Sequence, residues 1–274
     1  MSTTLPPHAL PYGVDRPMRR AADRALLGRP MRRAGDAPAT RHTVSLVVPV
    51  RDEARNIPWV FEQIPRCVDE VVLVGGSRVD AAVAEAEHCP PTVRRVRRSA
   101  PGTGGALRAG FAAATGEYIV MMDADGSMWP GEIPSLLHFL DLGYDFVKGS
   151  RHIPGGGSLD STLARSIGNR ALLAVANRLF HASMTDLCYG YYAFRRAFLD
   201  AHELRSPGFE IETEMIAYAL RCGLRIAEVP SLELPRRSGR SHPHAVSDGR
   251  RVLRTLFAER PGARSATPDA VGER

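Results

Sequence analysis

Two carboxylates held one residue apart, Asp123 and Asp125, end an apolar run that begins at Tyr118. Residues 119–122 form a short continuous apolar segment, typical of a strand covered on both faces. Gly126 supplies the backbone bend that lets both carboxylates turn toward one ion. Mg²⁺ or Mn²⁺ takes one or two protein carboxylates and fills its other positions with water and phosphate. The pair therefore predicts a divalent-metal site for a nucleotide diphosphate, with a plain acidic turn as the alternative.

The segments before this pair alternate between strand and helix patterns. Strands are expected over 44–50, 70–74, 92–96 and 119–122. Helices are expected between them, from near Glu53 to 65 and over 79–87 and 104–114. Successive βα units predict a parallel sheet with right-handed crossovers, so the carboxyl ends of these strands meet at one edge. Ligands of open α/β sheets bind at that edge, which places the carboxylate pair in a binding crevice.

The second half of the chain departs from this rhythm. It predicts a helix over 131–142, a strand over 146–149, a glycine-rich loop over 155–158, helices over 163–180, 210–221 and 246–260, and strands over 225–229 and 232–234. The long helix carries an apolar stripe at helical spacing, interpreted as core packing: Ile167, Leu172, Val175, Leu179 and Phe180. This half reads as an acceptor-side layer added to a nucleotide-binding half.

Length and composition predict one domain. The 274 residues are 44% hydrophobic, enough to bury one sizeable core over residues 42–260. The Pro- and Arg-rich segment 1–41 and the tail 261–274 are expected to be disordered arms. No apolar run reaches the roughly 18 residues that span a bilayer, and no secretory signal is recognisable. We therefore expect a cytoplasmic protein with at most peripheral membrane contact, its oligomeric state open and a homodimer included.

The basic and thiol side chains narrow the chemistry. The formal net charge is +6, and Lys148 is the only lysine, so the positive charge is almost all arginine, which suits bidentate phosphate recognition. Nucleic acid is the least expected partner, because the basic arm lacks interleaved aromatics. The cysteines show no CxxC spacing and predict reduced, partly buried thiols rather than zinc or disulfide sites: Cys67, Cys89, Cys188 and Cys222.

Five segments together resemble glycosyltransferase family two, nearest its dolichol-phosphate mannose synthase branch. They are VPVRDEARNI (48–57), DADGS (123–127), GSR (149–151), TDLCYGYYAFR (185–195) and GFEIETEM (208–215). The resemblance implies a GT-A fold: a Rossmann-like, mostly parallel sheet with helices on both faces and an acceptor-side extension. Its nucleotide half would be 42–127 and its acceptor half 128–260. It also implies inverting transfer from a UDP- or GDP-sugar, with Mg²⁺ or Mn²⁺, to a soluble hydroxyl or a polyprenyl-phosphate acceptor.

The resemblance implies donor-side roles for residues in the first half. Pro49, Val50 and Glu53 match the loop that holds the nucleoside base and ribose. Asp123 and Asp125 match the metal-binding pair.

Further positions follow from the same match. Ala124 separates the metal-binding pair, and Ser127 stands where some members place a third, weaker metal ligand. Arg151 is expected near the diphosphate or the acceptor phosphate. Arg236 and Ser241 belong to a loop that in this group is mobile and closes over the phosphates, which would exclude water from the donor.

Two departures from the family pattern fall on the donor side. The segment 74–80, VGGSRVD, lacks the usual acidic nucleoside contact, and Gly75 lies at that position. The loop around Gly104 carries Thr103 in place of a lysine, so we expect Arg108 to supply the missing cation. These changes keep open a catalytically weak nucleotide-sugar-binding protein. A nucleotidyltransferase is the other alternative, although the glycine-rich signature expected after its first strand is absent.

A hydroxyl acceptor also requires a base, for which Asp186 is our hypothesis. The rival interpretation is a carboxylate that orders Tyr189 or Arg195. If the acceptor is an ionised lipid phosphate, no base is needed. Further candidates lie on the helix over 210–221, where helical spacing puts the second on the face opposite the other two: Glu210, Glu212 and Glu214.

Overall fold

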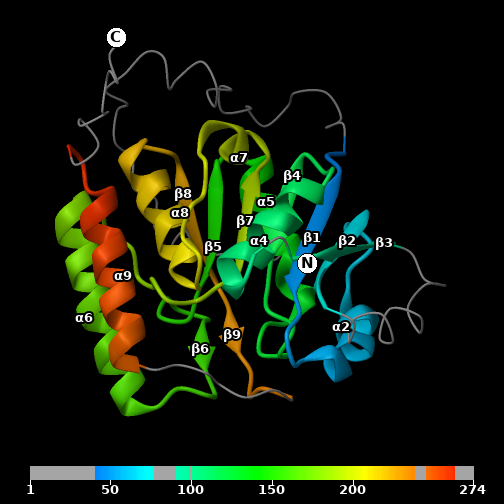
Figure 1. Cartoon of the computed structure of the whole chain (residues 1–274), viewed down its shortest axis with the longest axis horizontal. Coiled ribbons are helices and arrows are strands. Elements are labelled where there is room, and N and C mark those ends of the chain that lie inside the picture. The colour runs from blue at the N-terminus through cyan, green and yellow to red at the C-terminus, as the bar shows by residue number, and fades with distance from the viewer. Residues whose placement is uncertain (1–40, 77–90, 99, 238–244, 263–274) are drawn as a thin grey trace, which may run out of the picture.

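The computed structural model of the chain describes residues 41–76, 91–98, 100–237 and 245–262, and its centre is a seven-stranded sheet (Figure 1). The strand order is β3-β2-β1-β4-β7-β5-β8. The strands are β1 (Val44–Pro49), β2 (Glu70–Gly75), β3 (Thr92–Arg97), β4 (Tyr118–Met121), β5 (Phe146–Ser150), β7 (Tyr192–Arg195) and β8 (Ile226–Pro230). The first four are mutually parallel, as predicted, so their carboxyl ends share one edge.

Strand β7 is a feature that the sequence pattern does not predict. It lies between β4 and β5 and runs antiparallel to both, whereas β5 and β8 are parallel. The sheet is therefore mostly parallel, in agreement with the GT-A expectation. A second, two-stranded parallel sheet joins β6 (Gly157–Ser158) to β9 (Leu232–Glu233). Half of it falls in the segment expected to be only a glycine-rich loop.

Most helices follow the predicted positions closely, with small shifts at their ends, but the short helix α7 was not predicted from the sequence. They are α2 (Ile57–Gln63), α4 (Gly102–Ala113), α5 (Ile133–Asp141), α6 (Leu163–Phe180), α7 (Ala197–Ala201), α8 (Glu210–Arg221) and α9 (Ala245–Glu259). Short 3-10 turns, η1 (Ala54–Asn56) and η2 (Pro130–Glu132), precede α2 and α5. The helix expected over 79–87 lies outside the described residues, as do residues 1–40 and 263–274 of the two arms.

Alternation along β4 divides the core into two layers. Ile119 and Met121 pack with residues of α4, α6, α8 and α9, whereas Val120 and Met122 pack with residues of α2 and α5 on the other face. All four side chains are at most 2% exposed. The prediction that this strand is covered on both faces is confirmed, and its burial fixes where the following carboxylates emerge.

Helices α6 and α9 form an outer layer beyond α8, and they lie side by side at one end of the molecule (Figure 1). Phe180 is buried in this layer, as expected from the apolar stripe of α6. Ile167, however, is 60% exposed, so its assignment to the core is wrong. It lies on the first half of the helix, where Leu163 is also exposed.

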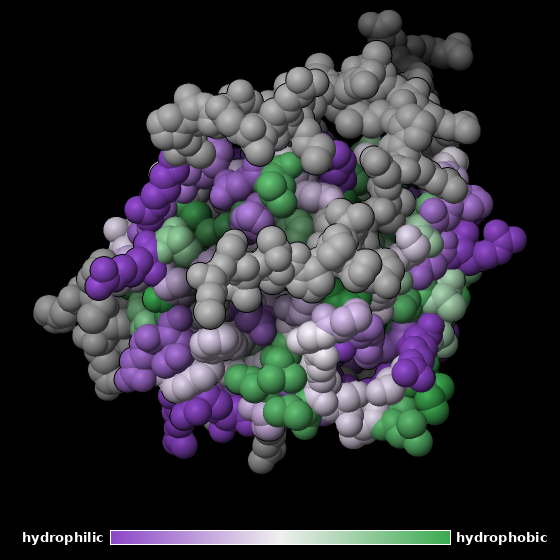
Figure 2. All heavy atoms as spheres, turned by 180° about the vertical axis from the view of Figure 1, so that it is seen from behind, coloured by the Kyte–Doolittle hydropathy of each residue, from purple (hydrophilic) through white to green (hydrophobic). Residues whose placement is uncertain are grey.

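The surface mixes hydrophobic and polar side chains, and the described cysteines carry free thiols. On the face opposite that of Figure 1, hydrophobic side chains appear in separate groups among polar ones (Figure 2). Within the described part of the chain, no helix combines the length and apolar character needed to cross a bilayer. Cys67, Cys188 and Cys222 are half-buried and form no disulfide.

The two environments of isoleucine give a stability test. Ile119→Ala should lower the free energy of unfolding by about 2–5 kcal/mol, because it leaves a cavity in a closed core. Ile167→Ala, the matched control at an exposed helical position, should change it by less than about 0.5 kcal/mol. Urea unfolding followed by circular dichroism measures both. Equal losses would contradict the assignment of these side chains to core and surface.

Candidate metal and nucleotide site

The turn after β4 holds both carboxylates at the ligand-binding edge of the sheet. Asp123 and Asp125 are half-buried, and Gly126 adopts a left-handed φ of 81°, which is the predicted bend. The Asn56 Nδ2 atom donates to the Ala124 carbonyl at 3.0 Å and ties the turn to the segment after β1. Sequence reasoning missed Asn56, although it belongs to the 48–57 motif. The backbone of the turn is thus held by Asn56, and its two carboxylates line a cavity.

A second segment runs along this turn and is bonded to it on both sides. The Leu234 amide donates to the Ser127 carbonyl at 2.8 Å, and the Arg237 amide donates to the Asp125 carbonyl at 2.9 Å. Between them, Arg236 Nε lies 2.9 Å from Asp125 Oδ2. The other oxygen, Asp125 Oδ1, accepts from the Ser127 amide at 2.9 Å. Ser241, the other loop residue expected here, lies outside the described residues.

A cavity of about 180 Å³ opens beside the carboxylates. Its charged and hydroxyl-bearing lining comes from five segments of the chain and includes Asp123, Asp125, Ser127, Arg165, Glu212, Thr213, Glu233 and Arg236. The described residues contain no cluster of three or more His, Cys, Asp or Glu side chains able to enclose a metal by themselves. The carboxylate pair would therefore leave most positions of a bound cation to water and a ligand.

Electrostatics at the pair favour a cation. Burial raises the pKa of Asp123 well above its ordinary value, and the charges of Glu212, Asp125 and Glu53 raise it further. Arg236 is the cation that opposes this shift. A guanidinium already contacts Asp125 at bonding distance, so the pair can be approached by a positive group. Hard oxygen donors with unbalanced negative charge fit Mg²⁺ or Mn²⁺.

The residues expected to hold the nucleoside lie at the same edge. Pro49 pairs with Val74 across β1 and β2, and the Val50 amide donates to the Val74 carbonyl at 2.8 Å. Gly75 ends the neighbouring strand β2. Glu53 accepts from two backbone amides of its own loop at 2.9 Å. These residues therefore lie where a nucleoside could bind, and their nucleoside-binding roles stay predictions.

Gly104 and Arg108 both bond to the loop that precedes α8, and the expected donor-side role of Arg108 stays a prediction. The Arg108 Nη1 atom donates to the Ser206 carbonyl at 2.6 Å, and the Gly104 amide donates to the Pro207 carbonyl at 3.0 Å. A Cβ at Gly104 would lie 2.0 Å from the Ser206 oxygen, so this position requires glycine. Neither residue lines the cavity. Both hold the loop that precedes α8.

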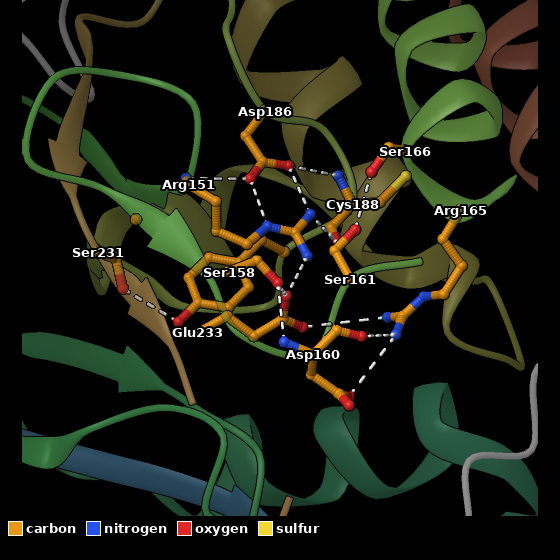
Figure 3. Close-up of polar contacts among 12 residues, drawn as sticks. Arg151, Ser158, Asp160, Ser161, Arg165, Ser166, Asp186, Cys188, Ser231 and Glu233 are labelled. Atoms are coloured by element: carbon orange, nitrogen blue, oxygen red, sulfur yellow. Dashed lines mark hydrogen bonds and ion pairs between the residues drawn. The ribbon is translucent and has the colours of Figure 1, made fainter. Parts of the chain in front are cut away.

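Arg151 is bonded to three other residues, Asp186, Cys188 and Glu233 (Figure 3). Its Nε and Nη2 atoms donate to the two oxygens of Asp186 at 2.7 and 3.0 Å, and Nη1 donates to Glu233 at 3.0 Å. Nη2 also reaches the Cys188 carbonyl, and the side chain is only 4% exposed. Protein acceptors thus engage four of the five N–H groups of the guanidinium, and the expected contact with a phosphate stays a prediction. Arg151 ties β5 to the 186–188 segment and to β9.

The same pairing bears on the two interpretations of Asp186. Its side chain is 1% exposed, and both oxygens accept from Arg151. Burial opposes ionisation, but the charge of Lys148 and the bonds to Arg151 lower the pKa of Asp186 to about 2. A carboxylate so strongly held is a poor base. The geometry favours the ordering role, with Arg151 as the residue ordered in place of Tyr189 or Arg195.

Glu212 takes a different position from its two neighbours on α8, as the helical spacing predicts. Glu214 accepts from the Arg205 and Ser206 amides, and Glu210 accepts from the Gly208 amide, so both serve the preceding loop. Glu212 lines the cavity instead. Burial raises its pKa to about 7, although Lys148 and Arg151 lower it. Among the acidic candidates proposed as bases, Glu212 is the one that lines the cavity.

Lys148 is a buried cation that interacts with Asp186 and Glu212, and sequence reasoning did not assign it a role. Its ammonium is fully buried and donates to the Tyr189 carbonyl at 2.8 Å and the Gly149 carbonyl at 3.1 Å. It also lies 5.1 Å from the centre of the Tyr192 ring. Burial lowers the pKa of Lys148. The available signal was its composition: a chain that uses arginine everywhere else keeps one lysine here.

The sheet order and the edge site define an α/β glycosyltransferase of the GT-A type. A model of the family described as Glycosyl transferase family 2 matches residues 45–202, and the chain belongs to that family. An uncharacterised glycosyltransferase of Mycobacterium tuberculosis is 32% identical over 209 residues, covering 76% of this chain and 90% of that protein. The resemblance seen in the sequence motifs is confirmed, and the nucleotidyltransferase alternative is set aside.

Two further relatives bear on chemistry. Undecaprenyl-phosphate mannosyltransferase of Micrococcus luteus is 30% identical, covering 72% of this chain and 86% of that protein. The crystal structure of glucosyl-3-phosphoglycerate synthase from Mycobacterium tuberculosis in complex with Mg²⁺ and UDP superposes with a TM-score of 0.64 at 25% identity. That match covers 80% of this chain and 79% of the other. These similarities agree with the predicted GT-A fold.

The buried Arg151–Asp186 pair predicts a pH-dependent stability. Asp186→Asn should lower the free energy of unfolding near pH 6 by about 3–5 kcal/mol, because it takes one of two charge partners from a buried guanidinium. A carboxyl whose folded pKa is depressed contributes stability above its unfolded pKa and loses it as the pH falls toward the folded value. The loss of unfolding free energy caused by Asp186→Asn should therefore be about 1 kcal/mol smaller at pH 3 than at pH 6. Urea unfolding of both proteins at both pH values tests this. A loss that does not change with pH would contradict the pairing.

Proposed function

We propose that the chain is a metal-dependent inverting glycosyltransferase that takes its sugar from a UDP- or GDP-sugar. The observation that carries this proposal is the half-buried carboxylate pair at the ligand-binding edge, beside a cavity whose electrostatics favour a cation. The similar crystal structure, which contains Mg²⁺ and UDP, supports the same ligand class. Transfer from such a donor needs stabilisation of the leaving diphosphate.

Asp123 and Asp125 would hold the cation, with the Ser127 hydroxyl beside them as a weaker ligand. A bound Mg²⁺ or Mn²⁺ would neutralise the charge that develops on the leaving diphosphate. The nucleoside would be bound at the carboxyl end of β1, by Pro49, Val50 and Glu53. Gly126 and the Asn56 contact hold the turn in the shape that this arrangement needs.

A polyprenyl phosphate is the acceptor class that we favour. Three apolar side chains at the start of α6 and just before it are largely exposed: Leu159 at 64%, Leu163 at 79% and Ile167 at 60%. Arg165, on the same turn of the helix, lines the cavity. Apolar groups beside a cavity-lining guanidinium suit a lipid that carries a phosphate. The undecaprenyl-phosphate specificity in the name of one relative supports this class.

A hydroxyl compound is the second candidate acceptor, favoured by the position of Glu212. This carboxyl lines the cavity that contains the carboxylate pair, where it could accept the hydroxyl proton. The other acidic candidates are engaged in structural hydrogen bonds, as described above. An ionised phosphate acceptor would leave Glu212 without a proton to remove, so the two classes make different predictions.

The metal site is tested by ligand-dependent stabilisation. With Mn²⁺ and UDP or GDP at 100 times the dissociation constant, wild type should gain about 2.7 kcal/mol of stability. Asp125→Asn should lose that gain while remaining folded. The matched control is Asp141→Asn, because Asp141 is exposed and lies beyond the other end of β4, bonded to the Tyr118 hydroxyl. Thermal unfolding measures all three, and an undiminished gain in Asp125→Asn would refute the site.

The acceptor class is tested with Glu212→Gln. If the acceptor is a hydroxyl compound, kcat should fall by about 100- to 10,000-fold, because the substitution removes the base. If the acceptor is a polyprenyl phosphate, the loss should be small. Transfer of radiolabelled sugar to undecaprenyl phosphate in detergent and to 3-phosphoglycerate distinguishes the two. A large loss with the lipid phosphate would show that the assignment of roles is wrong.

A further inference from the structure

The Arg236 guanidinium already contacts one of the proposed metal ligands, Asp125. Arg236 Nε lies 2.9 Å from Asp125 Oδ2, and the two side chains are only 26% and 14% exposed. Asp160 Oδ2 lies 3.9 Å from the same nitrogen, so a second carboxylate is within reach of this guanidinium. The pair lies inside the cavity rather than on the outer surface. Most surface ion pairs contribute little, but a partly buried one between fixed groups is stronger.

The backbone on either side of Arg236 is held against the carboxylate turn. The Leu234 and Arg237 amides donate to the carbonyls of Ser127 and Asp125. The Arg237 guanidinium lies 4.8 Å from the centre of the Trp59 ring. A Cβ at Gly126 would come within 2.8 Å of Arg237 Cγ, which shows how closely the segments approach. Arg236 is therefore positioned by the fold, whereas its side chain remains partly exposed.

The negative charge around Asp125 explains why a guanidinium is stabilised in this position. Asp123, Asp125 and Glu212 line one cavity, so their negative charges repel one another. Arg236 is the positive charge that reduces this repulsion. A divalent ion on Asp125 would do the same more strongly, and at such a short distance it would repel the guanidinium. Cation and guanidinium should therefore compete for this carboxylate.

We propose that Arg236 is a built-in counter-ion that occupies the place of the divalent cation on Asp125 until the cation arrives together with a diphosphate. This inference rests on the proposed function and adds an order of binding to it. The diphosphate oxygens would accept the guanidinium that the cation displaces, since arginine binds phosphate as readily as carboxylate. Free cation would then bind weakly, and cation and nucleotide would bind cooperatively.

The test measures the binding of Mn²⁺ to the full chain. Electron paramagnetic resonance monitors the titration, because it reports the concentration of the free ion. Titrations are done with Mn²⁺ alone and with Mn²⁺ plus saturating UDP or GDP. Arg236→Gln should bind Mn²⁺ alone roughly tenfold more tightly than wild type, because the competing charge is gone. In the presence of the diphosphate the same variant should bind Mn²⁺ more weakly than wild type. The matched control Arg237→Gln, whose guanidinium faces Trp59, should not show this reversal.

Each other outcome has a definite meaning. Equal affinity of wild type and Arg236→Gln for Mn²⁺ alone would overturn the counter-ion role, even if the diphosphate arm is weakened. Weaker binding in both arms would assign Arg236 a structural role and also overturn the inference. Absence of Mn²⁺ binding by both folded proteins in both arms would overturn the proposed function itself. Circular dichroism and thermal unfolding confirm that each variant is folded before titration.

Discussion

Repulsion between carboxylates at the end of the central strand is the constraint on which the site depends. Burial of β4 on both faces fixes where Asp123 and Asp125 emerge, and α8 brings Glu212 to the same cavity. Negative groups gathered in a partly buried place must be neutralised by protonation or by a cation. The chain meets this requirement with Arg236, and a divalent ion on a diphosphate would meet it better.

A second group of charged side chains, around Arg151, is neutralised by contacts within the protein. Arg151 is bonded to Asp186, Glu233 and the Cys188 carbonyl, which joins β5, β9 and the segment leading into β7 (Figure 3). Such a pair contributes little net stability compared with an apolar core, but removing one member is costly. This network therefore fixes geometry, whereas the carboxylates that line the cavity are only partly neutralised, and their proposed role is to bind a cation.

Sequence patterns predicted the parts of this arrangement that depend on local order. Apolar runs located β1, β2 and β4, the alternation of strand and helix patterns located β3, and helical spacing separated Glu212 from its neighbours on α8. The bend at Gly126 also followed from residue type. Each of these features is determined by residues within a few positions of one another, so periodicity is sufficient to find them.

Features that depend on distant pairing were not predictable in this way. Arg151 meets Asp186 and Glu233, which lie 35 and 82 positions away, and local sequence patterns do not reveal these partners. Strand β7 is short and enters the sheet between strands that precede it, and Ile167 follows a helical stripe that the fold leaves partly uncovered. In each case the tertiary arrangement decided the outcome, by a distant contact or by the lack of one. Only Lys148 left a trace in composition, as the single lysine of the chain.

The most direct measurement is anomalous diffraction at the manganese edge from crystals grown with Mn²⁺ and UDP or GDP. The account predicts one strong anomalous peak within bonding distance of the carboxylate oxygens of Asp123 and Asp125, with the diphosphate on its other side and the Arg236 guanidinium moved off Asp125. A nucleotide bound with no peak at this pair, or with Arg236 still seated on Asp125 and the metal elsewhere, would contradict it.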